Sequence, residues 1–178
     1  MKRIILAMTL LVTVSLVACA IPPNPPTQTT ASNTAAIPMV TPVTPTQTTI
    51  SDAAEETEIR DLVENFGKRL QDVSLLSSDA AQEMQKQYSE FVSPALLETW
   101  MSDVTKAPGR IVSSPWPDRI EITTLAKEGS DRYVITGFVV EVTSVEVVNG
   151  GAADRIPVHV VAQKDQGRWL ITEYSEER

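Results

Sequence analysis

The sequence predicts an α+β domain in which helices come first and an antiparallel sheet follows. Before residue 102, apolar residues recur at helical spacing, and after residue 117 they alternate with a period of two. All nine aromatic residues and nearly all charged ones lie after residue 51. A single folded domain over residues 52–178 is therefore expected, and it is long enough to bury a core of its own.

A long amphipathic helix is expected to open the domain. The sequence Asp52-Ala53-Ala54-Glu55 has the pattern of a capping box, which marks a helix start. An apolar stripe at helical spacing follows, made of Ile59, Leu62, Val63, Phe66 and Leu70.

Two shorter helices should come next. Asp79 starts the second, whose buried stripe holds Ala81, Met84, Tyr88 and Phe91. Ser93 and Pro94 form an N-cap and first-turn pair for the third, which continues through Leu96, Leu97, Trp100 and Met101.

Four strands are expected in the second half, over 119–126, 132–148, 155–163 and 167–174. Turn sequences separate them at 128–131, 149–151 and 164–167. Because short turns join antiparallel neighbours, the strands should form a meander. In the long second strand, Val145 and Val147 are expected to continue the face of Tyr133, Ile135 and Val139.

Residues 1–18 read as a signal peptide. Lys2 and Arg3 precede fifteen uncharged residues, a run typical of secretory signals and shorter than the roughly 20 residues that span a bilayer. Leu16-Val17-Ala18-Cys19 resembles the lipobox of bacterial lipoproteins. This resemblance implies cleavage before Cys19 and diacylglycerol on its thiol, hence a lipid anchor on the outer face of the cell membrane. Cleavage at Ala18 or Ala20, or an uncleaved membrane helix, are the alternatives.

Residues 19–51 are expected to hold the lipidated cysteine and a disordered spacer. The stretch from Ile21 to Ile50 contains no charged or aromatic residue and holds seven of the chain's twelve prolines. Such a segment cannot bury enough apolar surface to fold, so polyproline character is expected.

The domain resembles the NTF2-like (cystatin-like) superfamily over residues 53–176. The similarity lies in the order of the elements, in the Pro-x-Leu-Leu-x-x-Trp segment from Pro94 to Trp100, and in the last hairpin, Gln166 to Thr172. It implies a curved sheet of about four strands forming a cone, with Trp169 and Ile171 pointing inward and a concave face that can hold a ligand or partner. A cystatin-type sheet around one helix is the alternative.

Composition excludes several classes of site. With a net charge of −8, the chain lacks the basic surface that binds nucleic acid. One cysteine and one histidine exclude disulfide frameworks, Cys-rich zinc sites and two-histidine zinc motifs. Asp118 and Glu121 have no further ligands at calcium-loop spacing, and no Gly-x-Gly fingerprint is present. No metal and no cofactor are therefore expected.

Three carboxylates on strands are candidates for a pocket. Enzymes of the superfamily that the domain resembles use pocket carboxylates as bases, a role that a raised pKa suits. The resemblance implies this role most for Glu141, which is the most internal of the three. Glu146 is close to a turn, and Glu173 is expected to share a face with Trp169 and Ile171 near a strand end. Ion pairing across strands is the alternative role for all three.

His159 and Trp116 are the remaining candidates. A histidine in a pocket could be a general base, but a lone histidine on a mixed strand face is more often a surface residue. Trp116 lies between two prolines and is expected either to plug the core or to be an exposed binding anchor.

Two functions are thus open. The first is a lipid-anchored, extracytoplasmic module that binds a small ligand or an envelope protein without catalysis. The alternative is a pocket enzyme of lyase or isomerase type that uses Glu141 or His159.

Overall fold

The computed structural model describes residues 48–178, with side chains described from Asp52 onward. The predicted signal peptide, the lipobox Leu16-Val17-Ala18-Cys19 and most of the predicted spacer lie outside these residues. The predicted α+β class is confirmed. The elements, in chain order, are α1 (Thr48–Arg69), η1 (Leu70–Asp72), α2 (Ala80–Tyr88), α3 (Pro94–Ser102), η2 (Val104–Lys106), β1 (Trp116–Lys127), β2 (Arg132–Val142), α4 (Ser144–Asn149), β3 (Asp154–Asp165) and β4 (Arg168–Glu176).

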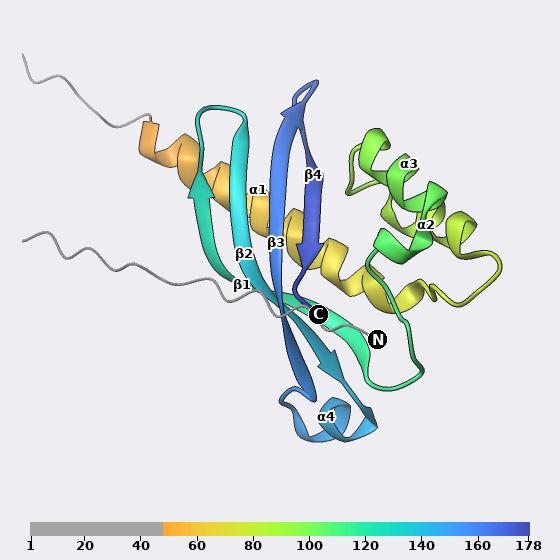
Figure 1. Cartoon of the computed structure of the whole chain (residues 1–178). Helices are drawn as coiled ribbons and strands as arrows, with labels where there is room; N and C mark the ends of the chain where they lie inside the picture. The colour runs from red at the N-terminus through yellow and green to blue at the C-terminus, as the bar shows by residue number, and fades with distance from the viewer. Residues whose placement is uncertain (1–47) are drawn as a thin grey trace, which may run out of the picture. The chain divides into compact units, whose positions relative to one another are not determined.

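The four strands form an antiparallel meander in the order β1-β2-β3-β4, as expected. Helix α1 crosses one face of this sheet, and α2 and α3 lie beyond the β4 edge (Figure 1). The segment between α2 and α3 joins that edge, because Ser93 N donates to Ile171 O at 2.8 Å and Ile171 N donates to Phe91 O at 2.8 Å.

The helix-covered, concave face of the sheet is packed with aromatic side chains. The ring centroids of Phe66 and Tyr88 are 5.1 Å apart, and those of Trp100 and Tyr174 are 5.9 Å apart. Trp169 belongs to the same buried cluster, as the superfamily resemblance implied. These rings fill the middle of the concave face, so the space there is taken up by the core.

Two glycines allow the backbones to approach closely. A Cβ on Gly137 of β2 would overlap the carbonyl oxygen of Glu121 on β1. A Cβ on Gly67 of α1 would lie 2.6 Å from Ile120 N. Both contacts are tighter than any larger residue tolerates, so glycine sets the spacing between α1, β1 and β2.

The predicted helix starts are confirmed for α2 and α3 but not for α1. Asp79 and Ser93 occupy the N-cap positions, and the Ser93 hydroxyl accepts from Leu96 N. The Asp79 side chain makes no capping hydrogen bond, so the capping box expected for Asp79-Ala80-Ala81-Gln82 is not formed. The predicted capping box at Asp52 is wrong, since α1 begins at Thr48 and Asp52 lies inside it. The Asp52 carboxylate instead accepts from Lys127 Nζ at 2.6 Å.

The prediction of one strand over 132–148 is wrong beyond Val142. Thr143 and Glu146 form a capping box there and start the short helix α4. The carboxylate of Glu146 accepts from Thr143 N at 2.8 Å and from Thr143 Oγ1 at 2.5 Å. As a result Val145 and Val147 are not covered but exposed.

The predicted orientation of Glu173 is also wrong. A β-bulge between Val161 and Ala162, opposite Thr172, shifts the register of β4 by one residue. Tyr174 therefore packs against the core in place of Glu173, which is exposed and accepts from Arg132 Nη1 at 3.3 Å. A one-residue slip of this kind moves every later side chain to the other face.

Candidate functional site

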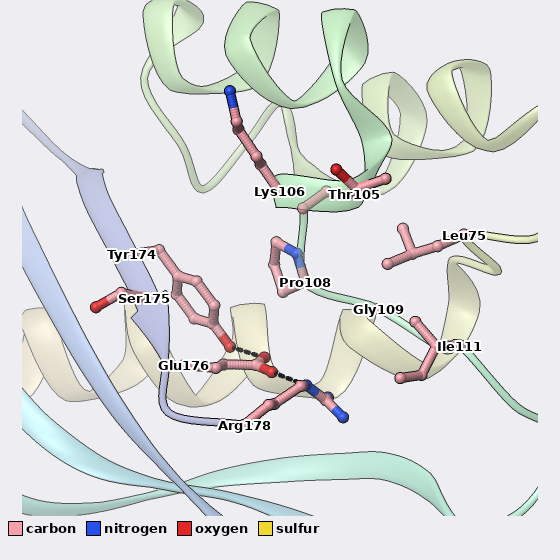
Figure 2. A pocket seen from close by; sticks show the side chains of 11 residues that line it. Leu75, Thr105, Lys106, Pro108, Gly109, Ile111, Tyr174, Ser175, Glu176 and Arg178 are labelled. Atoms are coloured by element: carbon pink, nitrogen blue, oxygen red, sulfur yellow. Dashed lines mark hydrogen bonds and ion pairs between the residues drawn. The ribbon is translucent and has the colours of Figure 1, made fainter. Parts of the chain in front are cut away.

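A pocket of about 320 Å³ opens beside the last residues of β4. It lies between the end of that strand and the segment that follows α3 (Figure 2). Leu75, Pro108 and Ile111 form its apolar wall, while Glu176 and Arg178 supply its charged side. Lys106 stands at the rim and pairs with Asp103 at 3.3 Å.

A continuous chain of polar contacts runs along the base of the pocket. Tyr174 Oη donates to Glu176 Oε1 at 2.6 Å, and Arg178 Nε donates to Glu176 Oε2 at 2.5 Å (Figure 2). Arg178 Nη2 also donates to Glu141 Oε1 at 3.2 Å. One guanidinium thus joins carboxylates from β2 and β4, each with only 9 % of its side chain exposed.

The electrostatics fix the protonation of two members of this chain. Burial, and then the neighbouring Glu176 carboxylate, raise the pKa of Tyr174 well above 10.0, so the phenol remains a donor. Desolvation opposes the charge of Arg178, but the carboxylates of Glu176 and Glu141 outweigh it and raise the guanidinium pKa. The cation is therefore a permanent part of the site.

The opposite wall of the pocket is held in place from the core. Tyr88 Oη donates to Pro108 O at 2.9 Å, and burial raises the pKa of Tyr88, so this bond persists. Next to it, Arg110 N donates to Val73 O at 2.9 Å. A Cβ on Gly109 would lie 2.9 Å from Val73 O, so glycine permits this close approach. The wall is rigid rather than a free loop.

This arrangement offers hydrogen-bond donors to a bound molecule. A guanidinium has five N–H donors, and the two bonds above use one on Nε and one on Nη2. The remaining donors of Arg178 suit an acceptor such as a carbonyl or carboxylate oxygen, beside the apolar wall of Leu75 and Ile111.

Of the two residues predicted for catalysis, only Glu141 contacts this site: it does not line the pocket but accepts from the lining residue Arg178. His159 lies on the other face of the sheet, where it is exposed between Thr136 of β2 and Ser175 of β4. The structure therefore does not bring Glu141 and His159 together. The carboxylate of Glu141 is engaged by Arg178, which agrees with the alternative of ion pairing.

The other candidates lie outside the pocket. Glu146 caps α4. Trp116 is the first residue of β1, pairs with Val142 and is half-buried, so it neither joins the core cluster nor extends into solvent as an anchor. Asp118 and Glu121 both accept from Arg119. Among residues 48–178, no group of three or more potential ligands could hold a metal ion.

Sequence reasoning missed Glu176 and Arg178. Glu176 follows the β-bulge at Thr172. A regular alternation along β4 without this bulge would place Glu176 on the outer face of the sheet. Arg178 lies past the last strand, where no periodicity applies. The only signal in the sequence was the alternation Tyr174-Ser175-Glu176, which puts an aromatic residue and an acid on one face.

Comparisons with known proteins give little further identification. No family model and no curated protein match the chain. One solved structure that matches is a chain whose title begins "Rd1NTF2_05" and records five substitutions, with 19% sequence identity over 69% of this chain and 99% of that chain. Its TM-score of 0.35 is too low to support a conclusion about this chain. The α+β assignment rests on the elements described above.

Proposed function

We propose that this protein is a lipid-anchored, extracytoplasmic binding module. Support for the anchor comes from the sequence, where the chain's one cysteine, Cys19, stands at the position that a lipobox requires. Two or three acyl chains on one residue hold a protein stably at a bilayer. In the described part of the chain, no helix is both long and apolar enough to cross a membrane.

We place the binding site in the pocket beside β4. The main support for this assignment is the cluster of ion pairs around Arg178. Two carboxylates, Glu141 and Glu176, are nine-tenths buried around the guanidinium of Arg178. Buried ion pairs of this kind are seldom a net gain in folding energy, because desolvation offsets the Coulomb attraction. A polar cluster at the base of an apolar pocket is typical of a ligand site.

The ligand is a small molecule, or a side chain of an envelope protein, with an apolar body and a hydrogen-bond acceptor. The acceptor meets the free N–H groups of Arg178, and the body contacts Leu75, Pro108 and Ile111. The protein binds this ligand without transforming it, since Glu141 is already paired and His159 is on the opposite face.

A thermal-shift screen of small carboxylates, amides and ketones against the full chain tests the site. Ile111→Trp fills the pocket mouth, whereas Val112→Trp is a matched control next to it that does not line the pocket. Compounds that bind should stabilise the wild type and Val112→Trp by mass action but leave Ile111→Trp unchanged. Equal stabilisation of both variants, or no stabilising compound, contradicts the proposal.

Replacement of Cys19 by Ala tests the anchor. The wild-type chain should sediment with the membranes of its host, and Cys19→Ala should move to the soluble fraction. A variant that stays with the membranes contradicts the lipid assignment.

A further inference from the structure

The pocket beside β4 does not balance its own charges. Its ionised lining residues are Lys106, Glu176 and Arg178. Lys106 pairs with Asp103, and Arg178 pairs with both Glu176 and Glu141. The cluster therefore contains two cations and three carboxylates, so one negative charge is left over within it.

Water screens this extra charge poorly. The side chains of Glu141 and Glu176 are both nine-tenths buried, and they share a single guanidinium. The Tyr174 hydroxyl donates to Glu176 but brings no charge. Because an uncompensated charge away from water is costly, a ligand group that carries a positive charge is stabilised here.

Glu176 is the carboxylate that such a group can reach. Glu176 lines the pocket, whereas Glu141 does not. Oε1 of Glu176 accepts from Tyr174 Oη, and Oε2 accepts from Arg178 Nε (Figure 2). A carboxylate offers about four lone-pair sites, so Glu176 can accept further hydrogen bonds from an ammonium group.

Arg178 presents the complementary group next to this acceptor. Its Nε and Nη2 donate to Glu176 and Glu141, whereas Nη1 makes no hydrogen bond within the part of the chain whose side chains are described. The donor and the acceptor are joined directly, since Arg178 Nε lies 2.5 Å from Glu176 Oε2. A ligand that matches the pair carries a carboxylate and an ammonium group a short distance apart, as an α-amino acid does.

Ligands with only one of these groups fit the charges less well. A simple carboxylate satisfies Arg178 but adds a second negative charge to a cluster that already has one in excess. A simple amine balances the charge but leaves the N–H donors of Arg178 without an acceptor. A zwitterion makes charge-assisted hydrogen bonds at both groups, which are the stronger kind.

The size and the walls of the pocket define the rest of the ligand. The volume of about 320 Å³ lies at the lower end of the range of about 300–1,000 Å³ for ligand pockets. Leu75, Pro108 and Ile111 supply an apolar wall. This space suits the apolar side chain of a single amino acid and not a longer peptide.

We infer that the pocket beside β4 binds a free, apolar α-amino acid. Its carboxylate meets Arg178, its ammonium group meets Glu176, and its side chain contacts the wall of Leu75, Pro108 and Ile111. The inference rests on the proposed function, which requires only an acceptor and an apolar body, and adds the ammonium group and the class of compound.

Calorimetric titration of the full chain tests the inference. The probes are L-valine, L-leucine, L-isoleucine, L-methionine and L-phenylalanine, followed by analogues of the tightest binder that lack the amine or the carboxylate. For L-leucine these analogues are isocaproic acid and isoamylamine. The amino acid should bind at least about tenfold more tightly than either analogue, which is the effect of one hydrogen bond to a charged group.

Two variants locate the ammonium group. Glu176→Gln should remove most of the preference for the amino acid over the analogue without the amine. Glu177→Gln is the control, since Glu177 is an exposed neighbour that does not line the pocket, and it should change the affinity by less than about twofold. A preference that survives Glu176→Gln overturns the inference. If that variant does not fold, the analogue series on the wild type decides.

The outcomes separate this inference from the proposed function. If the analogue without the amine binds as tightly as the amino acid, the inference fails but the acceptor site stands. Equal binding of the analogue without the carboxylate also overturns the inference. If none of the amino acids binds, the inference fails, and the screen of carboxylates, amides and ketones then decides whether the proposed site fails with it.

Discussion

The two ends of the sheet differ in whether their side chains have partners within the domain. At the end where α1 begins, Lys127 Nζ donates to Asp52 Oδ1 at 2.6 Å and to Glu55 Oε2 at 2.8 Å, and Lys164 Nζ donates to Glu55 Oε1 at 3.0 Å. At the opposite end, where α4 connects β2 and β3, the valines of α4 contact solvent. The charged side chains of the first end therefore have partners within the domain, whereas the apolar side chains of α4 are left exposed.

The same contrast holds for the ion pairs. Lys127 and Lys164 lie over the rings of Tyr133 and Trp169, at 5.8 and 5.2 Å from the centroids, and join α1 to the sheet. Arg178 joins Glu141 to Glu176 but keeps N–H donors for a ligand. The ion pairs where α1 begins therefore serve the fold, whereas the donors that Arg178 keeps are those that the proposed ligand would use.

The largest expected effect comes from Gly137, the glycine that lets the backbones of β1 and β2 approach closely. Gly137→Ala should destabilise the protein by about 2 kcal/mol or more, because the new Cβ overlaps the Glu121 carbonyl. Gly129→Ala is the control: Gly129 has a φ of 80° but no neighbour within 4 Å, so only backbone strain of about 1 kcal/mol applies. Urea denaturation measures both, and equal effects would show that the close contact is unimportant.

Removal of the pocket cation should have the next largest effect. Arg178→Ala leaves Glu141 and Glu176 buried without a counter-charge, at a cost of about 1–2 kcal/mol, reduced from the value for a fully buried pair because Arg178 is partly exposed. Adding Glu141→Gln to this variant should restore part of the loss. Arg168→Ala, at an exposed position at the start of β4, is the control. If the double variant is no more stable than Arg178→Ala, the two carboxylates do not repel as the account requires.

A smaller effect is expected where α1 begins. Lys127→Met should lower the thermal midpoint by about 2 °C at low salt and by less at about 1 M NaCl, because exposed ion pairs are weak and screened. Lys86→Met, which removes a pair of 3.9 Å on α2, is the control. A loss that persists at high salt would assign the effect to packing on Tyr133 instead.

The pH dependence of that loss has a defined sign. Hydrogen bonds from Lys127 and Lys164 lower the pKa of Glu55 below 4.5. A carboxylate with a depressed folded-state pKa stabilises the protein above its unfolded-state pKa, and this contribution disappears as the pH falls through the folded-state value. The difference between wild type and Lys127→Met should therefore shrink in acid below about pH 4.

The smallest effect on stability is expected in helix α4. Val148→Ser should change the free energy of unfolding by less than about 0.5 kcal/mol, since Val148 is 81% exposed. The same substitution at Val139, which is fully buried on β2, should cost more than about 2 kcal/mol. A clear loss at Val148 would mean that its side chain packs on the domain in solution.

Local sequence signals predicted much of the fold. The stripe from Ile59 to Leu70 and the caps at Asp79 and Ser93 placed the helices, since these signals depend on neighbours a few residues apart. The four-strand meander followed from alternation and turn sequences. Helix α4 was missed because its valines favour strands, although the capping pair Thr143 and Glu146 was present in the sequence.

The candidate site was predicted only in part. Glu141 was identified because it is an acid inside a strand of β-formers, and the structure does bury it. Glu176 could not be identified, because its orientation depends on a β-bulge in the pairing of β3 with β4. Such a bulge is set by contacts between two strands and leaves no local signal in the sequence. The alternating pattern around His159 is the same whether its face of the sheet is covered or open to solvent. The sequence alone therefore did not decide the exposure of His159.

The mass of the mature N-terminal peptide, isolated from the native host, tests most directly whether this domain is held at a membrane through lipid on Cys19. The account predicts a chain that begins at Cys19 and carries the added mass of diacylglycerol, with or without a further acyl group. A peptide with an unmodified Cys19, or one that still contains residues before it, would contradict the account.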